Sequence, residues 1–243
     1  MSNNIYLSVV IPAYNEEKRL PKTLKDVDSY LSKQNYNYEI IVVSDGSKDK
    51  TGDNVRGLMS QIKNLKFIDN KENHGKGFVT RQGMLEAKGS FRVFMDADNS
   101  TNIDQVEKMW PFFKQGYDVL VGSRSIKGAI LDPPQGFTRK LTGNAFRLLT
   151  DIFTGLWDID DSQCGFKGFT AKASETIFPK CKIDRFSFDA EILVIAKKLK
   201  YKIKEFPITW KNDLESKVQF KSMVKMGFDL VKISINIITR KYD

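Results

Sequence analysis

The chain has 243 residues, enough for one large α/β domain or for a domain with a modest extension. Its content of 41% hydrophobic and 12% aromatic residues is ordinary for a globular protein. Its formal charge of +9 indicates either an anionic partner, such as nucleic acid, an acidic membrane or a phosphorylated ligand, or solubility alone. Two cysteines exclude a disulfide framework and a cysteine metal cluster, and without a signal-peptide pattern or an uncharged apolar run of roughly 18 residues we expect only peripheral membrane contact.

Short apolar runs alternate with longer polar segments of helical period through the first half of the chain. The runs are rich in β-branched residues and nearly continuous, which is typical of parallel strands buried on both faces. We predict strands at 7–12, 39–44, 65–70, 91–96 and 117–122, and helices at 17–33, 51–62, 77–88 and 103–115. This alternating order predicts an α/β fold whose ligands bind at the carboxyl ends of the strands.

The second half is less regular. Residues 125–137 contain two prolines and are predicted to be a loop. We then expect a basic amphipathic segment at 139–157, a short strand at 165–170, a helix at 187–199, a strand at 201–208 and an apolar helix at 218–239. No repeat, low-complexity tract or linker divides the chain, so we expect a single domain over 1–243.

Two aspartates, Asp96 and Asp98, end the fourth predicted strand on either side of Ala97. Residues i and i+2 of an extended chain point to the same side, so both carboxylates can face one point. Adjacent carboxylates repel, and Mg²⁺ or Mn²⁺ between them would also bind the oxygens of a diphosphate. The alternative is that they cap the helix predicted to begin near Ile103.

Three other predicted strands end in polar motifs. The first ends in residues 11–16, which include Tyr14, the second in 44–47, which include Asp45, and the third in 73–77, which include Lys76 between two glycines. Tyr14 could pack on a base, Asp45 could accept hydrogen bonds from a base or ribose, and Lys76 could approach phosphate oxygens. Each motif alone also fits an ordinary turn, but the coincidence at successive strand ends favours one ligand cleft.

These motifs occur in an order that resembles glycosyltransferase family 2. The resemblance runs from about Leu7 to Leu230 and is carried by SVVIPAYNEEKRL, EIIVVSDGSKDKT, HGKGFVTRQGMLEAKGSFRVFMDAD and VGSR. The later segments DSQCGFKGF, FSFDAEILVIAKK and IKEFPITWKND resemble the dolichyl-phosphate β-glucosyltransferase branch, a group that uses polyprenyl-phosphate acceptors. The resemblance implies a GT-A type, Rossmann-like three-layer sandwich with a mostly parallel central sheet.

The resemblance also implies a donor site in the first half, residues 1–124, with a UDP-sugar as donor. The residues that match the motif around the nucleotide base are Pro12, Ala13, Tyr14 and Glu16. Asp45 matches the residue that recognises the uracil or ribose side, and Lys76 matches a loop lysine near the nucleotide. Asp96 and Asp98, with Ala97 between them, match the D-x-D that holds Mg²⁺ or Mn²⁺ on the donor diphosphate.

Residues 125–243 are implied to form the acceptor half, with the C-terminal helix. Arg124 matches the arginine of a G-S-R motif that faces the acceptor phosphate, and Arg139 is expected to play a similar part. Asp161, Gln163 and Cys164 fall in a segment close to the transferred sugar. The residues expected to be catalytic are Asp98, Arg124, Asp161 and Gln163.

The scarcity of histidine indicates the mechanism, because His74 is the only one and lies in a glycine-containing loop. A sugar hydroxyl normally needs an enzyme base, whereas a phosphate monoester is already ionised at neutral pH. We therefore expect a single inverting displacement in which UDP-glucose and polyprenyl phosphate give polyprenyl-phospho-β-glucose and UDP. The competing mechanism has a hydroxyl acceptor on a soluble glycan or glycolipid, with Asp161, Asp189 or Glu191 as base.

Other functional classes fit less well. A nucleic-acid-binding module would be expected to carry basic residues and aromatics on one surface, whereas the strand-end motifs gather acidic residues. An oxidoreductase would need G-x-G-x-x-G after the first strand, where IPAYNEE stands, and the intact D-x-D argues against a non-catalytic homologue.

We expect a cytoplasmic protein held peripherally at the cytoplasmic face of a membrane, with no nucleic-acid partner, and leave its oligomeric state open. Part of 130–157 would contact the lipid headgroups, and most of 218–239 would pack on the core.

Overall fold

The computed structural model describes residues 4–134, 137–211 and 220–243, excluding the side chains of 137–141 and 220–224. The first half contains β1 (Leu7–Ala13), α1 (Leu20–Leu31), β2 (Tyr38–Asp45), α2 (Thr51–Leu58), β3 (Leu65–Asn70), α3 (Lys76–Glu86), β4 (Phe91–Phe94), the 3₁₀ helix η1 (Ile103–Lys108), α4 (Trp110–Lys114) and β5 (Val119–Ser123). The second half contains β6 (Ile130–Asp132), α5 (Phe137–Thr154), β7 (Lys167–Thr170), α6 (Ala171–Ile177), η2 (Phe178–Lys180), α7 (Phe188–Lys198), β8 (Ile203–Pro207), β9 (Thr209–Lys211) and α8 (Phe220–Ile238).

Within the described residues, seven strands form one sheet in the order β3-β2-β1-β4-β7-β5-β8. Every neighbouring pair is parallel except those that include β7, which runs antiparallel to both β4 and β5. The sheet is therefore mostly parallel, as the apolar runs predict. The strand ends that carry the polar motifs meet at one edge, because β1 lies between β2 and β4.

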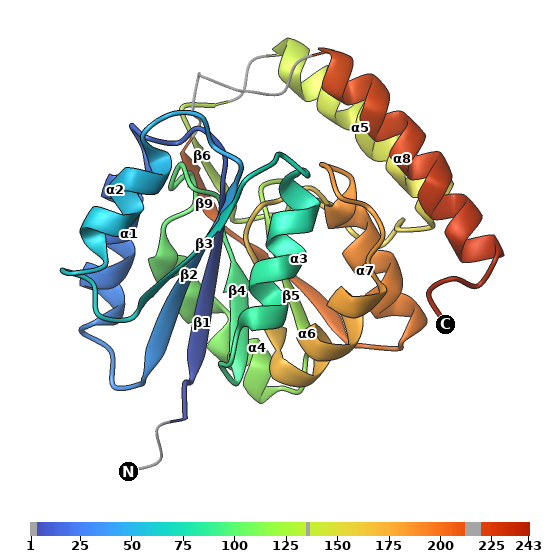
Figure 1. The fold of residues 1–243 in the computed structure, drawn as a ribbon. Helices are drawn as coiled ribbons and strands as arrows, with labels where there is room; N and C mark the ends of the chain where they lie inside the picture. Colours follow the sequence, from blue (N-terminus) through green and yellow to red (C-terminus); the bar gives the residue numbers. More distant parts are fainter. Residues whose placement is uncertain (1–3, 135–136, 212–219) are drawn as a thin grey trace.

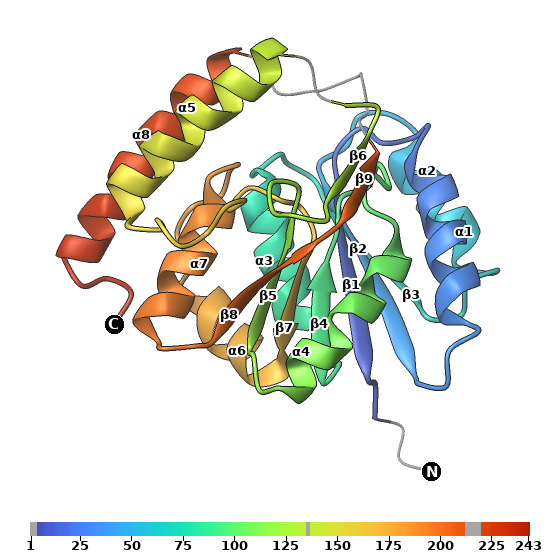
Figure 2. The ribbon, with the colours of Figure 1, turned by 180° about the vertical axis from the view of Figure 1, so that it is seen from behind.

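Helices cover both faces of the sheet and produce three layers (Figures 1 and 2). Alternate residues of β1 divide between two hydrophobic clusters: Val9 and Ile11 pack with side chains of α1, α2, η1 and α4, whereas Val10 packs with those of α3, α6 and α7. This alternation follows from the two-residue side-chain period of a strand. Outside α7, the long helices α5 and α8 run side by side.

A small parallel sheet of β6 and β9 lies beside the carboxyl edge of the large one (Figure 2). It is tied there by backbone hydrogen bonds, from Ile208 N–H to Ser123 O at 3.2 Å and from Lys211 N–H to Ser100 O at 2.7 Å. The prediction of a continuous loop over 125–137 is thus wrong at β6, since the strand is formed by long-range pairing rather than by a local pattern.

The predicted helix over 103–115 is also wrong in detail. The structure has a 3₁₀ helix that ends at Lys108, followed by the short helix α4, which has Pro111 in its first turn. Proline has no N–H to donate and is accommodated only in the first turn of a helix. The proline therefore starts a new helix instead of continuing the first one.

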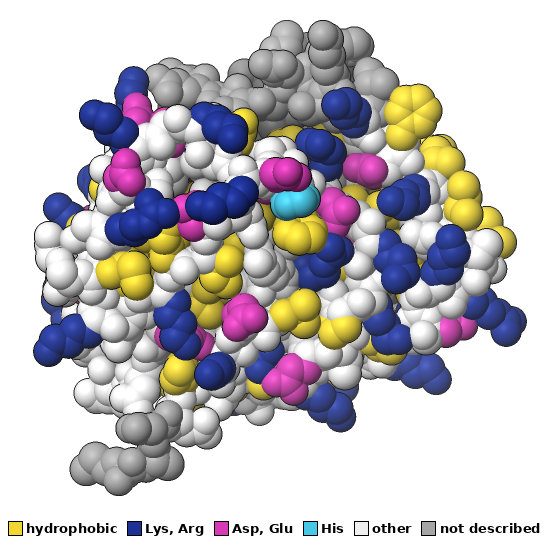
Figure 3. Space-filling model, in the orientation of Figure 1, with side chains coloured by type: hydrophobic (Ala, Val, Ile, Leu, Met, Phe, Trp, Pro, Cys, Tyr) yellow, Lys and Arg dark blue, Asp and Glu magenta, His cyan; other side chains and the backbone are white. Residues whose placement is uncertain are grey.

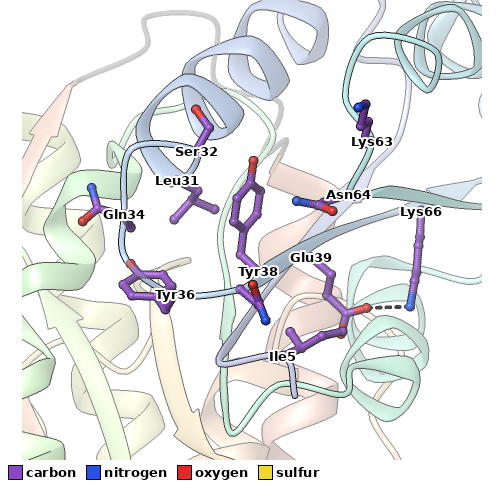
Figure 4. Close-up of a pocket in the computed structure, with 11 residues that line it drawn as sticks. Ile5, Leu31, Ser32, Gln34, Tyr36, Tyr38, Glu39, Lys63, Asn64 and Lys66 are labelled. Carbon is purple, nitrogen blue, oxygen red and sulfur yellow. Dashed lines mark hydrogen bonds and ion pairs between the residues drawn. The ribbon is translucent and has the colours of Figure 1, made fainter. Parts of the chain in front are cut away.

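The opposite, amino edge of the sheet carries an open pocket of about 530 Å³ (Figure 4). Tyr36, Tyr38 and Glu39 are among its lining residues, and Lys66 forms an ion pair with Glu39 there. None of the residues predicted to form the ligand cleft lines this pocket.

Candidate active site

The loops that follow β1 and β2 are bound to each other at the carboxyl edge. The backbone N–H of Asn15 donates to Ser47 Oγ at 3.1 Å, and Asn15 Oδ1 accepts the N–H of Lys48 at 2.8 Å. The N–H of Glu16 donates to Thr51 Oγ1 at 2.8 Å. These bonds fix the two loops as one wall of the site.

The residues predicted to surround a base occupy this wall. Pro12 and Ala13 are buried within β1, and the side chain of Tyr14 is 42% exposed, so its ring is accessible for packing. Glu16 receives two hydrogen bonds of 2.7 Å from the guanidinium of Arg19. Arg19 is not predicted from the sequence, although a cation three residues after Glu16 can reach it across the turn that precedes α1.

Asp45 organises the loop after β3. Its carboxylate is almost fully buried and accepts the N–H groups of His74 and Gly75 at 2.7 and 2.9 Å and the amide of Asn73 at 2.8 Å. A carboxylate has about four acceptor positions, so these three bonds leave little capacity for a ligand. The side chain of His74 is exposed and packs on Phe78 with the two rings tilted by 34° and 4.5 Å between their centroids.

The loop lysine reaches the D-x-D motif. Lys76 forms an ion pair with Asp96, and the backbone N–H of Ser100 donates to Asp98 at 2.9 Å. A guanidinium nitrogen of Arg19 lies 3.9 Å from Asp98 Oδ2. Burial and the neighbouring Asp96 carboxylate raise the pKa of Asp98, as expected for two carboxylates that share one place.

Asp96 and Asp98 fit a divalent cation that is completed by its ligand. Mg²⁺ is commonly held by one or two carboxylates together with substrate phosphates and water. Within 4–134, 137–211 and 220–243 no cluster of three or more His, Cys, Asp or Glu side chains is suited to a metal, so a metal here would rely on that two-carboxylate arrangement.

Space for the Asp96 carboxylate depends on Gly165. A Cβ on Gly165 would lie 2.0 Å from Asp96 Oδ2 and 2.4 Å from its Cγ, which no side chain allows. The segment that contains Gly165 therefore lies directly against the first aspartate. The sequence does not predict this role of Gly165, because a contact between residues so far apart along the chain is not visible in it.

The other end of the same segment clamps Arg124. Asp161 accepts hydrogen bonds from Nε and Nη2 of Arg124 at 2.7 and 2.8 Å, and from its backbone N–H at 3.0 Å. The guanidinium also lies over the ring of Trp210, 5.5 Å from the centroid. Arginine has five N–H donors, and the pair with Asp161 uses two of the side-chain donors.

The pair also determines the charge of Asp161. Burial alone would raise the pKa of this carboxyl, but the adjacent Arg124 holds it below its usual range. Glu205 of β8 adds to the anchoring, since its carboxylate accepts the backbone N–H groups of Asp160 and Asp161 at 2.7 and 2.9 Å. Asp161 is therefore a fixed anion and a weak base.

Between these two ends, Gln163 and Cys164 differ in what they offer a ligand. The Nε2 donor of Gln163 is buried and has no hydrogen-bond partner among the groups that the structure describes. A buried donor without a partner is costly, so it is suited to an acceptor on a ligand. Cys164 is buried as a thiol, because burial, with the Asp161 charge, raises its pKa to about 12.

The two other carboxylates considered as bases have different partners. Asp189 forms a buried ion pair with Lys167, which also donates to Cys164 O at 2.6 Å. Glu191 accepts backbone N–H groups and a tyrosine hydroxyl. Burial raises the pKa of both carboxyls, but neither is free to approach an acceptor hydroxyl. The side chain of Arg139, expected at the acceptor phosphate, lies outside the described residues.

Comparison with known proteins gives this site a family. Residues 8–178 match the model of Glycosyl transferase family 2. A dolichyl-phosphate beta-glucosyltransferase of Trichomonas vaginalis is 36% identical over 244 residues, which cover 95% of this chain and 73% of the relative. Dolichyl-phosphate beta-glucosyltransferases of Dictyostelium discoideum and Homo sapiens are 35% and 34% identical, covering 95% and 96% of this chain and 74% and 76% of their own lengths.

Solved structures agree on the fold. Glucosyl-3-phosphoglycerate synthase from Mycobacterium tuberculosis, in complex with Mn²⁺, UDP and glucosyl-3-phosphoglycerate, matches with a TM-score of 0.68 at 16% identity, covering 96% of this chain and 79% of that one. Staphylococcus aureus TarS in complex with UDP-GlcNAc matches with a TM-score of 0.58 at 19% identity, covering 96% of this chain and 67% of that one. The predicted GT-A type fold is confirmed, and because the family model matches most of its length, the chain belongs to glycosyltransferase family 2.

Proposed function

We propose that this glycosyltransferase transfers glucose from UDP-glucose to a dolichyl-type polyprenyl phosphate with inversion at the anomeric carbon. The names of the relatives at about 35% identity support this substrate pair. One structural observation carries the proposal: the segment from Asp161 to Gly165 contacts Arg124 at one end and Asp96 at the other. On this proposal, the cation that binds the acceptor phosphate and the aspartate that serves the donor diphosphate are held on the two sides of one short segment.

The proposed donor site is the wall made by the loops after β1 to β4. Tyr14 packs on the uracil, flanked by Pro12, Ala13 and Glu16. Asp45 acts mainly by holding the loop that presents Lys76 to the diphosphate, with its remaining acceptor position available to the uracil or ribose side. Mg²⁺ or Mn²⁺ would be held by Asp96 and Asp98, and when bound it would stabilise the negative charge of the departing UDP.

In the proposed reaction an oxygen of the acceptor phosphate attacks the anomeric carbon. A C–O bond forms there as the bond to the UDP oxygen breaks, and the electron pair leaves with UDP. The phosphate is already ionised, so no enzyme base is needed. Arg124, held by Asp161, binds and orients the phosphate through its remaining guanidinium donors, and Arg139 is proposed to assist. The unpartnered amide donor of Gln163 is proposed to bind a sugar hydroxyl.

This assignment divides the chain into two functional parts. Residues 1–124 would bind the nucleotide sugar, and residues 125–243 would bind the acceptor. The two parts share one sheet, since β5, which leads to Arg124, pairs with β7 and β8 from the second part, so the two proposed sites would be adjacent.

A lipid acceptor requires a surface that meets the bilayer, and α5 and α8 supply a candidate. Their large exposed hydrophobic side chains, with Trp157 just after α5, are Leu148, Leu149, Ile152, Phe228, Val231, Ile235 and Ile238. Figure 3 shows hydrophobic side chains along the outer edge where α8 lies, beside Lys and Arg side chains. Apolar side chains next to cations are typical of helices that lie in an interface with anionic lipid.

We therefore propose peripheral attachment at the cytoplasmic face of a membrane through this α5/α8 face. This proposal differs from the expectation that most of 218–239 packs on the core. On α8, Leu230 and Ile233 are buried, whereas Phe228 and Ile238 are 72% and 77% exposed. Of the helices that the structure describes, none has the length and apolarity needed to cross a bilayer.

The direct test is transfer of radiolabel from UDP-glucose into polyprenyl phosphate, extracted into organic solvent, with Mn²⁺ or Mg²⁺ present. Wild type should give a labelled lipid whose formation stops on chelation. Asp98→Ala should abolish it, and Arg124→Lys should lower the rate on the order of 10²-fold, because a lysine cannot bind phosphate bidentately.

Label that appears only in free glucose, or in a soluble glycan, would contradict the acceptor assignment while keeping the family. Exchange of the donor for UDP-galactose and GDP-mannose in the same assay checks the sugar and the base. A rate with either that equals the rate with UDP-glucose would contradict the donor assignment.

A further inference from the structure

A buried carboxylate on α7 has no part in the proposed chemistry. Glu191 is 0% exposed and accepts the backbone N–H groups of Lys182 and Ile183 at 2.8 and 2.9 Å. The hydroxyl of Tyr242, also 0% exposed, donates to Glu191 at 2.7 Å, and Asn236 of α8 donates to that hydroxyl at 3.1 Å. One carboxylate thus joins α7, the turn before it and the segment after α8.

The turn that Glu191 holds is bound in addition to α3. The carbonyl of Asp184 accepts the N–H of Phe78 at 3.0 Å. Arg81, one turn further along α3, donates to Cys181 O and to the Asp184 carboxylate, both at 2.9 Å. The first two turns of α3 are therefore fastened to this turn by three hydrogen bonds.

Two glycines bring the loop before α3 into direct contact with the same turn. A Cβ at Gly75 would lie 2.3 Å from Asp184 O, and a Cβ at Gly77 would lie 2.5 Å from Ile183 O. Gly75 also has a φ of +113°, which other residues rarely adopt. Lys76, between these glycines, therefore takes its position from the turn that Glu191 holds.

We propose that Glu191 and Tyr242 are positioning residues for the donor-phosphate loop, acting through the turn at 182–184. Neither contacts substrate; they fix where the loop places Lys76 and the N–H groups that bind Asp45. The inference rests on the proposed function, in which Lys76 binds the donor diphosphate. It also connects the helix with the proposed membrane face to that loop, because Tyr242 follows α8.

The test removes one hydroxyl and leaves the ring in place. Tyr242→Phe should raise hydrogen exchange of the amides at 74–78 roughly tenfold, since a lost bond to a buried carboxylate is worth about a decade in an opening equilibrium. The affinity for UDP with Mn²⁺, measured by calorimetry, should fall roughly fivefold. In transfer assays the KM for UDP-glucose should rise. The kcat of the reaction and the KM for polyprenyl phosphate should both stay nearly constant.

Tyr201→Phe is the matched control, because the Tyr201 hydroxyl makes a hydrogen bond of 2.6 Å to Thr176 away from the loop. This variant should change none of the three readouts: exchange at 74–78, UDP affinity and KM for UDP-glucose. Glu191→Gln keeps the shape and should act in the same direction as Tyr242→Phe.

Unchanged exchange at 74–78, or unchanged UDP affinity in Tyr242→Phe while the melting temperature falls, would overturn the proposal and leave the network as a fold anchor only. Amide hydrogen exchange is measured without sugar donor or lipid acceptor. A wrong assignment of the substrates would therefore leave the exchange result intact, and the two failures can be told apart.

Discussion

Asp96, the first aspartate of the D-x-D motif, lies against a neighbour that has no side chain. In Gly165→Ala the new methyl group would require Asp96 or the backbone of 161–165 to move, since the Cβ would lie 2.0 Å from a carboxylate oxygen. A shift of about 1 Å at reacting groups can cost on the order of 10²-fold in rate. We expect transfer activity to fall by about that factor and half-maximal activity to need more Mn²⁺, which a metal titration of the rate measures.

The control substitution is Gly57→Ala in α2, where nothing lies within 4 Å of the added carbon. This variant should keep full activity and gain up to about 1 kcal/mol of stability, because alanine is favoured over glycine in a helix. If Gly165→Ala keeps the wild-type transfer rate and the wild-type Mn²⁺ concentration for half-maximal activity, the contact between Gly165 and Asp96 does not position that aspartate.

For single residues, the sequence predicts which polar side chains lie at the strand ends, but not which side chains they contact. Asp96, Asp98 and Lys76 could be predicted to lie near one another because polar residues after buried runs are visible in the sequence, and in the structure Lys76 pairs with Asp96, which neighbours Asp98; their roles stay predictions. The roles of Arg19 and Gly165 could not be predicted, since each depends on a contact made only after the chain folds.

At the scale of elements, Glu39 fastens the amino end of β2 to its surroundings. Its buried carboxylate accepts hydrogen bonds from Ser8 of β1 and from the backbone N–H of Lys88. It also accepts one from Lys66 of β3, which Figure 4 shows. Burial alone would raise the pKa of Glu39, but these donors hold it below the usual value of 4.5. A lowered folded pKa stabilises the fold above the unfolded value, and this contribution is lost as pH falls through the folded value.

We therefore expect the free energy of unfolding of wild type to decline as pH falls from about 5 towards 3. In Glu39→Gln the stability at neutral pH should be lower and this part of the decline shallower, as urea unfolding at several pH values would measure. Glu86→Gln, at an exposed position of α3, should reproduce the wild-type slope. Equal slopes in Glu39→Gln and wild type would exclude Glu39 as a source of the acid sensitivity.

Element prediction succeeded where periodicity is long and failed where pairing is distant. The five strands of the first half have apolar runs that can be recognised directly, and each appears in the sheet. The three-residue strands β6 and β9 have no such pattern and exist because they pair with each other. Pro111 lies in the first turn of α4, just after η1 ends, so the single helix predicted over 103–115 is divided there.

The exposed face of α5 and α8 supports a prediction at the same scale. Phe228→Ser combined with Ile238→Ser removes two large apolar side chains that contribute little to the core, so stability should stay within about 1 kcal/mol. Burial of each side chain in an interface is worth about 1.5–3 kcal/mol, so sedimentation with phosphatidylcholine–phosphatidylglycerol vesicles should weaken by 10-fold or more. Leu85→Ser combined with Met59→Ser, also at exposed positions, is the control, and equal loss in both variants would contradict a specific membrane face.

At the scale of the whole molecule, charge and apolar surface should act together. The formal charge of +9 draws the chain to anionic lipid, with about 1 kcal/mol for each Lys or Arg near the surface, and this attraction is screened beyond about 10 Å at 0.1 M salt. The apolar side chains act at contact and are insensitive to salt.

Binding to vesicles that contain phosphatidylglycerol should therefore fall at least tenfold as salt rises from about 0.05 to 0.5 M, whereas weak binding to pure phosphatidylcholine should persist unchanged. Transfer to a short-chain, water-soluble polyprenyl phosphate should respond much less than transfer to acceptor in vesicles, because only the latter needs the surface. If transfer to the two acceptors depends equally on salt, the salt effect acts where the acceptor phosphate binds. That result would contradict a role of the positive charge in membrane attachment.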